Sequence, residues 1–311
     1  MEGVIQFLSA AVIAGTPLLF ATIGEVFTQR SGHLNLGVEG MMLMGAVSGF
    51  SAGLSSQNPI VALLAAMLGG AAGALIYAIL TVTLRAEQNV TGLALTIFGT
   101  GLSAFMGKEL IGQIVPEAVK AFFKPISLPV LGQIPVIGPV FFRQDAFVYL
   151  GYLVAIIGGI YLFKTRLGLN LRSVGENPAA ADAAGINITL YKYLHILIGG
   201  ALCGLGGAYL SLVYVPAWQE NITAGRGWIA VALVIFANWN PYKALLGAYV
   251  FGGLDILRFR VQSLNLPIND HFIAMLPYLV TIIVLVVASM RNSKDNAAPK
   301  GLAVPYFREE R

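Results

Sequence analysis

The sequence contains few charged residues, which excludes most soluble folds. Only 11% of its 311 residues are charged and 57% are hydrophobic, whereas about 25% of the residues in a soluble domain are charged. A soluble fold of this length cannot bury so many apolar side chains, so lipid must cover some of them. The sequence also lacks the alternation of a β-barrel, and a backbone in lipid must satisfy its own hydrogen bonds. We therefore predict an all-α, polytopic transmembrane helical bundle.

Residues that form catalytic and metal centres are scarce. The single cysteine, Cys203, lies within an apolar run, and we interpret it as a small residue of helix packing. The three histidines are far apart in the sequence, and no His-Glu-x-x-His motif occurs. The nucleotide-binding pattern Gly-x4-Gly-Lys-Ser/Thr is absent, because Gly107 and Lys108 are followed by Glu109. We expect no catalytic residue, no metal site and no cofactor in this chain.

Apolar runs separated by polar links fill most of the chain, and about 20 residues cross the hydrocarbon core as a helix. We predict about nine spans. They are Val4–Val26, Met41–Leu54, Pro59–Leu84, Thr91–Met106, Ala146–Phe163, Thr189–Tyr214, Trp228–Trp239, Tyr242–Phe259 and Phe272–Met290. The second and the seventh would cross only about 20 Å, and each follows a glycine-rich polar segment. This is typical of a discontinuous helix, whose exposed backbone must face protein or water.

The distribution of Lys and Arg favours one orientation in the membrane. If residues 164–192 and the C-terminal tail are cytoplasmic, 12 of the 19 Lys and Arg residues lie inside and 7 lie outside. This bias predicts an external N-terminus and a cytoplasmic C-terminus. The formal net charge of +4 then reflects loop orientation, and we expect no nucleic-acid partner.

The chain also contains an internal repeat. The segment Asn58–Ala66 resembles Asn240–Ala248, and at the same offset of 182 residues Gly70 matches Gly252. The two copies have opposite orientations in the predicted topology, and inverted repeats with broken helices are typical of transporters. The predicted organisation is a single transmembrane domain at 1–290 with inverted halves at about 4–106 and 189–290, a connecting span and cytoplasmic helix at 146–188, and a cytoplasmic tail at 291–311.

Two acidic residues, Glu25 and Glu39, flank the polar segment 28–37. Ionisable groups at membrane depth are costly and suggest a functional role. For Glu25 the alternative is an interfacial position paired with Arg30. For Glu39 two roles remain equally open: it could shape or gate a solute path, or it could cap a helix.

Amide and aromatic side chains could hold an uncharged polar solute. Asn35 and Asn89 lie at or near predicted helix ends, and Trp228 and Phe98 are candidates for stacking. Trp239 is a third candidate for stacking, and for it an interfacial aromatic belt is the alternative.

The polar stretch 164–192 contains the signals of a short Ala-rich helix. Asn177 can cap it, Pro178 suits its first turn, and Gly185 can end it. A helix of this length is not stable alone. We therefore expect it to contact a partner surface, and the alternative is a solvated loop helix.

Three segments resemble one family. Residues 175–186 resemble the cytoplasmic coupling motif of permease subunits in ABC importers of the ribose and branched-chain amino acid type. Residues 31–42, from Ser31-Gly32-His33 to Met41-Met42, resemble the signature of the nucleoside-type branch. Residues 225–232, followed by Asn240-Pro241, fit the same branch, and the resemblance covers roughly residues 5–290.

The resemblance implies a permease subunit that is not itself an enzyme. Its expected partners are a second homologous permease, an ABC ATPase that holds ATP and Mg²⁺, a substrate-binding lipoprotein and membrane lipid, and its expected location is the bacterial inner membrane. The predicted ATPase-coupling residues are Gly175, Glu176, Asn177, Pro178, Ala180 and Gly185. The residues predicted by position to line the substrate path are Asn35, Glu39, Asn89 and Trp228.

Nucleosides are the expected solute, because a path with amides, aromatics and little fixed charge suits them. A simple sugar or a branched-chain amino acid is the alternative within the family. A secondary transporter that uses Glu25 and Glu39 for ion coupling is the alternative outside it, since the inverted repeat fits both classes equally well.

Overall fold

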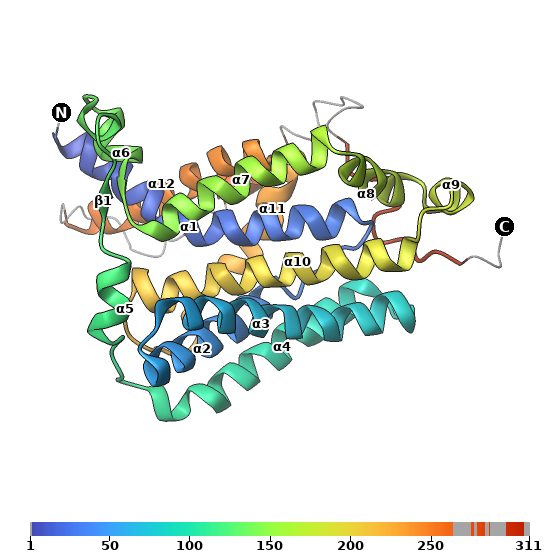
Figure 1. The fold of residues 1–311 in the computed structure, drawn as a ribbon, viewed down its shortest axis with the longest axis horizontal. Helices are drawn as coiled ribbons and strands as arrows, with labels where there is room; N and C mark the ends of the chain where they lie inside the picture. Colours follow the sequence, from blue (N-terminus) through green and yellow to red (C-terminus); the bar gives the residue numbers. More distant parts are fainter. Residues whose placement is uncertain (1, 264–274, 277–278, 284–285, 287–296, 308–311) are drawn as a thin grey trace.

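The computed structural model describes residues 2–263, 275–276, 279–283, 286 and 297–307. Long helices lie side by side along one direction (Figure 1). They are α1 (Glu2–Arg30), α2 (Val38–Ser56), α3 (Pro59–Ala78), α4 (Gln88–Gly107), α7 (Ala146–Lys164), α10 (Ile188–Tyr209) and α12 (Pro241–Ser263). The π-helical turns η1 (Ile79–Thr83) and η4 (Leu210–Tyr214) extend α3 and α10. The all-α prediction is confirmed.

Most of the short elements lie at the two ends of the bundle (Figure 1), whereas α11 packs against α1, α2 and α12. The short α-helices are α5 (Glu117–Phe122), α6 (Ile137–Phe141), α8 (Arg166–Glu176), α9 (Pro178–Ala183) and α11 (Arg226–Phe236). Two 3₁₀ turns are η2 (Lys108–Leu110) and η3 (Leu131–Gln133). The strands β1 (Ile126–Ser127) and β2 (Arg143–Gln144) pair antiparallel, with Ile126 opposite Gln144.

Within the described residues, five helices are long and apolar enough to cross a membrane. Eight of the predicted spans coincide with helices, and the ninth, Phe272–Met290, lies mostly outside the described residues. The length predicted for the second span was wrong. Helix α2 has 19 residues, because it begins at Val38 and ends at Ser56, beyond both ends of the predicted span. Helix α11 is short, as predicted, with 11 residues.

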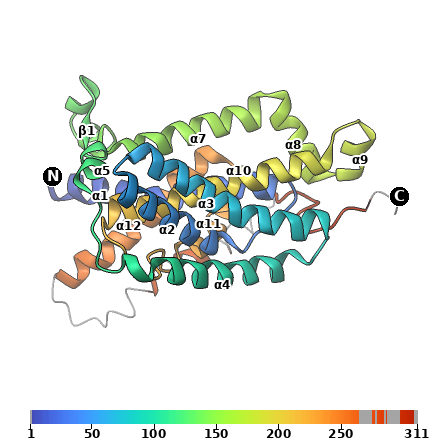
Figure 2. The same ribbon diagram turned by 60° about the horizontal axis from the view of Figure 1, so that its bottom comes forward.

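Helices α1 and α10 form the centre of the bundle and cross antiparallel. Gly206 contacts the carbonyl oxygen of Pro17, and Gly199 contacts that of Gly24, so residue numbers fall along α10 as they rise along α1. The most apolar window of α10–η4 is 78% buried, against 33% for the corresponding windows of α3–η1 and α4–η2. Helix α4 lies at the outer edge in Figure 2.

The outer helices pack on the centre in a crossed pattern. Helix α3 packs on α10, and its counterpart α12 packs on α1. Small residues make both contacts. In α3 and α10 they are Ala66, Gly70, Gly200 and Gly204; in α12 and α1 they are Ala248, Gly252, Ala11 and Gly15. The offset of 182 residues found in the sequence relates Ala66 and Gly70 to Ala248 and Gly252. Equivalent faces of α3 and α12 therefore pack on different central helices, α3 on α10 and α12 on α1. An inverted repeat predicts this arrangement.

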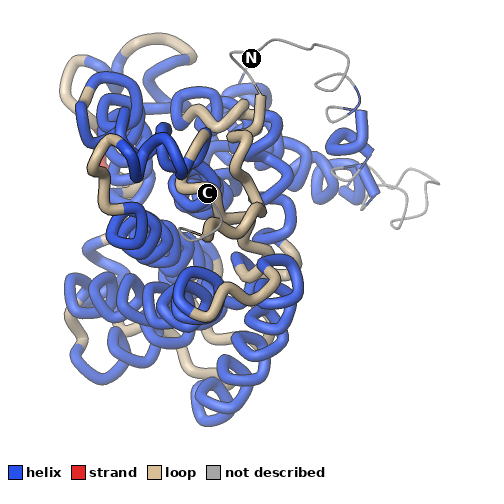
Figure 3. Tube along the Cα trace, turned by 90° about the vertical axis from the view of Figure 1, so that its right-hand side faces the viewer, coloured by secondary structure: helices blue, strands red, loops and turns tan. Residues whose placement is uncertain are grey.

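The two ends of the bundle differ. The start of α1 lies at one end with β1 and α6, whereas α8 and α9 lie at the other (Figure 1). Figure 3 looks onto this second end of the bundle. Which of the two ends faces the cytoplasm stays a prediction.

Candidate functional site

The polar loop between α1 and α2 is buried, and protein groups satisfy its backbone. The N–H of Leu34 donates to Oε1 of Gln88 at 2.8 Å, and its carbonyl accepts from the hydroxyl of Tyr77 at 2.7 Å. Oδ1 of Asn35 accepts from the N–H of Gly37 at 2.8 Å. Burial lowers the pKa of the neighbouring His33 to about 3. Buried non-helical backbone requires such partners.

Glu39 joins the start of α2 to the start of α11. Its carboxylate accepts from the hydroxyl of Thr223 at 2.5 Å and from the N–H groups of Gly225 at 2.8 Å and Gly227 at 2.6 Å. These N–H groups lie at the beginning of α11, which has no cap from its own side chains. A Cβ at Gly227 would lie 2.5 Å from the Cα of Glu39. The structure thus gives Glu39 the role of a helix cap that joins the two halves.

The predicted pair of Glu25 with Arg30 was wrong. Glu25 is fully buried and accepts from the side-chain amide of Gln29 at 2.9 Å and the N–H of Asn35 at 3.1 Å. Arg30 donates instead to the carbonyl of Trp239 at 3.3 Å. The indole N–H of Trp239 donates to Gln29 at 2.6 Å, and the ring is buried. Trp239 is therefore not part of an interfacial belt but joins α1 to the turn before α12.

The short Ala-rich helix predicted from the sequence is confirmed as α9. Asn177 caps it, since its Oδ1 accepts from the N–H of Ala180 at 3.0 Å, and Pro178 occupies the first turn. Gly185 follows the helix with a φ of 81°, a conformation that glycine adopts at little cost. The preceding α8 was not predicted as a helix. It is amphipathic and buries Leu171 and Val174 with two glycines.

Residues 297–307, the C-terminal strap, dock on this end of the molecule. The N–H of Gly301 donates to the carbonyl of Gly175 at 2.8 Å, and that of Ala303 donates to the carbonyl of Gly32 at 3.1 Å. The hydroxyl of Tyr306 donates to Asp182 of α9 at 3.0 Å. The strap thus connects the coupling motif to the polar loop after α1, a contact that sequence reasoning missed.

A family model described as the permease component of branched-chain amino acid transport systems matches residues 7–288. The chain belongs to this permease family. With its apolar helices, this membership makes the chain a multi-pass membrane permease, which is a transport component and not an enzyme. The resemblance that the three motifs indicated is confirmed.

Three relatives are similar to the permease over nearly their whole lengths. A Haloferax volcanii protein, named provisionally as a glucose ABC transporter permease, is 38% identical, and the match covers 97% of each chain. The guanosine ABC transporter permease of Bacillus subtilis is 35% identical, with 99% of each chain covered. The nucleoside ABC transporter permease of Lactococcus lactis is 37% identical, with 96% of each chain covered.

The structure separates the four residues predicted to line the substrate path of the permease into two groups. Asn35 and Glu39 lie buried together beside the polar loop, where protein groups bind them. Asn89 lies half-buried at the start of α4 and donates to Glu87 at 2.7 Å. Trp228, on α11 next to the glycine that contacts Glu39, is 37% exposed. Their role in transport stays a prediction.

Sequence reasoning missed two polar groups near this junction. Thr223 is fully buried and donates to Glu39, and Arg226 pairs with Asp255 at 2.8 Å. A glycine on each side of Arg226 was the only local signal of the close approach between α11 and α2.

Proposed function

We propose that the chain is the permease subunit of an ATP-driven ABC importer of nucleosides. The observation that carries this proposal is the similarity, over nearly full length, to two permeases named for a nucleoside and for guanosine, at 37% and 35% identity. The similar identity to a glucose permease makes a sugar the second candidate. Both solutes present sugar hydroxyls, and a nucleoside adds a flat base.

The charges near the junction favour an uncharged solute. Both carboxylate oxygens of Glu39 already accept hydrogen bonds from the protein, and Arg226 is paired with Asp255. A zwitterionic amino acid would need a partner for each of its charges. These bonds also weigh against ion coupling through Glu39. The partly exposed ring of Trp228 is available to stack on a base.

The surface of α9 supports the proposed ATPase contact. Glu176, Asn177 and Ala180 are exposed, while a local cap and the packing of Ala181 hold the helix in place. A partner ATPase that docks there would bind ATP and Mg²⁺ and move α9.

The outer face of α4 supports a second permease as partner. Ile97 and Phe105 are 75% and 81% exposed, so lipid or another subunit must cover them. A substrate-binding lipoprotein on the opposite side of a bacterial inner membrane completes the proposed assembly.

Co-purification and transport test the proposal. The tagged chain, extracted in mild detergent, should bring with it an ABC ATPase and a second permease. The assembly in liposomes should accumulate radiolabelled guanosine with ATP, and unlabelled uridine should compete more strongly than glucose or leucine. Stronger competition by glucose would assign a sugar instead. Uptake that needs no ATPase and collapses with the ion gradient would refute the importer.

A further inference from the structure

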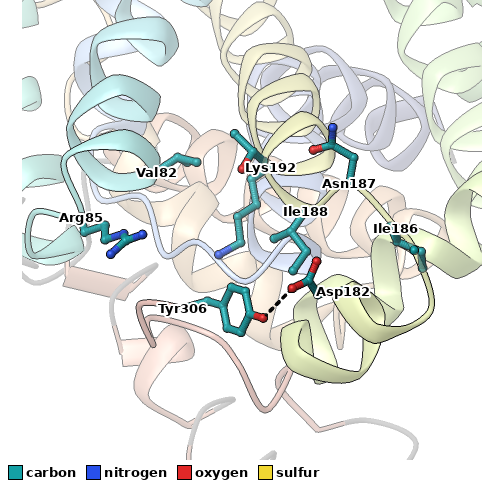
Figure 4. A pocket seen from close by; sticks show the side chains of 10 residues that line it. Val82, Arg85, Asp182, Ile186, Asn187, Ile188, Lys192 and Tyr306 are labelled. Carbon is teal, nitrogen blue, oxygen red and sulfur yellow. Dashed lines mark hydrogen bonds between the residues drawn. The ribbon is translucent and has the colours of Figure 1, made fainter. Parts of the chain in front are cut away.

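A pocket of about 450 Å³ lies at the end of the bundle that carries α9 (Figure 4). It is bounded by α9, the start of α10, the end of η1 and the C-terminal strap. The polar side chains that line it are Arg85, Asp182, Asn187, Thr189, Lys192 and Tyr306. None of these residues has a part in the proposed nucleoside path.

Lys192 is buried, and none of the described residues pairs with it. Its side chain is only 7% exposed, and it points into the pocket between Arg85 and Tyr306 (Figure 4). It forms no hydrogen bond or ion pair with any residue that the structure describes. An isolated buried ammonium is costly, so this position calls for an anion.

Two further groups favour an anion at the same place. The pocket lies at the N-terminus of α10, a helix of 22 residues. The side chain of Asn187 accepts from the N–H of Leu190 at 3.0 Å, which leaves the N–H groups of Ile188 and Thr189 without a partner inside the helix. Such termini bind phosphate and carboxylate groups. The guanidinium of Arg85 lies 4.6 Å from the ring centre of Phe307 and adds a second cation to the pocket wall.

The one carboxylate among the lining residues is already engaged. Asp182 accepts from the hydroxyl of Tyr306 at 3.0 Å. The pocket therefore offers a lysine, an arginine and backbone N–H groups to a ligand, in a volume larger than a single small ion needs.

We propose that this pocket binds a phosphate group, either of a free phosphate compound or of an anionic lipid headgroup. Arginine and lysine together with helix N–H groups are a common set of phosphate donors. Because Tyr306 of the strap lines the pocket, a bound phosphate and the docked strap stabilise each other, and the occupied pocket holds α9 in place.

Calorimetry with inorganic phosphate tests the site, independently of the transported solute. The full chain is placed in nanodiscs of phosphatidylcholine and titrated with phosphate. Lys192→Met removes the charge and keeps much of the side-chain volume, so phosphate should bind at least about tenfold more weakly, which is about 1.4 kcal/mol. Lys164→Met removes an exposed lysine at the end of α7 and should leave binding unchanged.

The same titration in nanodiscs that contain phosphatidylglycerol distinguishes a free phosphate compound from a lipid headgroup as the ligand. Loss of phosphate binding in these nanodiscs, or retention of the lipid in native mass spectrometry by the parent chain but not by Lys192→Met, assigns a lipid headgroup. Binding that persists there assigns a free phosphate compound. Equal affinity of Lys192→Met and the parent chain would overturn the proposal, and so would the absence of both phosphate and lipid binding.

Two variants guard against a folding artefact. Lys192→Arg keeps the charge and should retain binding. Arg85→Gln changes an exposed side chain and should weaken phosphate binding about threefold with an unchanged elution profile in size exclusion. Full phosphate affinity in a folded Arg85→Gln variant would contradict the site even if Lys192→Met were unstable.

Discussion

Helices α11 and α9 are both short, but their N-termini are capped in opposite ways. Asn177 caps α9 from the position directly before it, whereas Glu39 caps α11 from 188 residues away in the chain. A local cap forms whenever its own segment folds. A distant cap forms only after the two halves have come into contact. The capping of α11 therefore depends on assembly of the bundle, whereas the capping of α9 does not.

This difference suits two functions. The start of α11 is fixed by a buried carboxylate that also holds α2, which makes the junction of the halves a single rigid unit. Helix α9 keeps its shape through its own residues while its outer face stays exposed. It can therefore move with a partner without unfolding.

The largest loss of stability is expected when the distant cap of α11, Glu39, is removed. In Glu39→Ala the N–H groups of Gly225 and Gly227 and the hydroxyl of Thr223 lose their acceptor, which should cost about 3 kcal/mol or more. Thermal unfolding of the purified permease in detergent measures the loss.

Glu87→Ala is the matched control for Glu39. Glu87 also caps a helix with its carboxylate, through Asn89 and Val90, but it is local and exposed. Its removal should lower the unfolding temperature far less. Equal losses in the two variants would show that a distant cap is no stronger than a local one.

Acid should loosen the polar loop before it affects α9. Burial lowers the pKa of His33 to about 3 from an ordinary 6.5, so the unfolded chain takes up the proton first as the pH falls through 6.5. This histidine should reduce the free energy of unfolding by ~1.4 kcal/mol between pH 7.5 and pH 5.5. His33→Asn should remove this contribution from the pH dependence of thermal unfolding, and an unchanged slope would contradict this.

Removal of the local cap of α9 should lower the stability of the whole protein only slightly. Asn177→Ala leaves the N–H of Ala180 without its side-chain acceptor, at a cost of about 1 kcal/mol. The permease should keep nearly its parental melting temperature but retain less ATPase in pull-down experiments. Asn177→Ser restores a capping oxygen and should recover the ATPase. A large drop in melting temperature would place α9 in the rigid part of the molecule.

The smallest effect is expected at the strap. Tyr306→Phe removes the hydrogen bond to Asp182, which is worth about 0.5 kcal/mol. Trypsin should then cleave after Lys300, an exposed residue, faster than in the parent chain. Tyr149→Phe removes a hydroxyl that donates to Ile126 near β1 and β2 and should not change this rate.

The sequence by itself determined the class of the molecule and its local features. Low charge and long apolar runs require helices in lipid, whatever the tertiary arrangement. The order Asn177, Pro178, Gly185 specifies α9, because capping and helix termination depend on neighbouring residues. The internal repeat could also be predicted from the sequence, since Asn58 and Asn240 precede equivalent helices.

Only the tertiary structure decided which polar groups meet. Glu39 was as compatible with a solute path as with a cap until its acceptor role toward Thr223 and Gly227 was visible. The contact of the strap with Gly175, and the position of Lys192 in a polar pocket, were equally unpredictable from the sequence. These contacts join residues that are far apart in the chain. A local sequence pattern does not predict which distant group forms the hydrogen bond that a buried polar group requires.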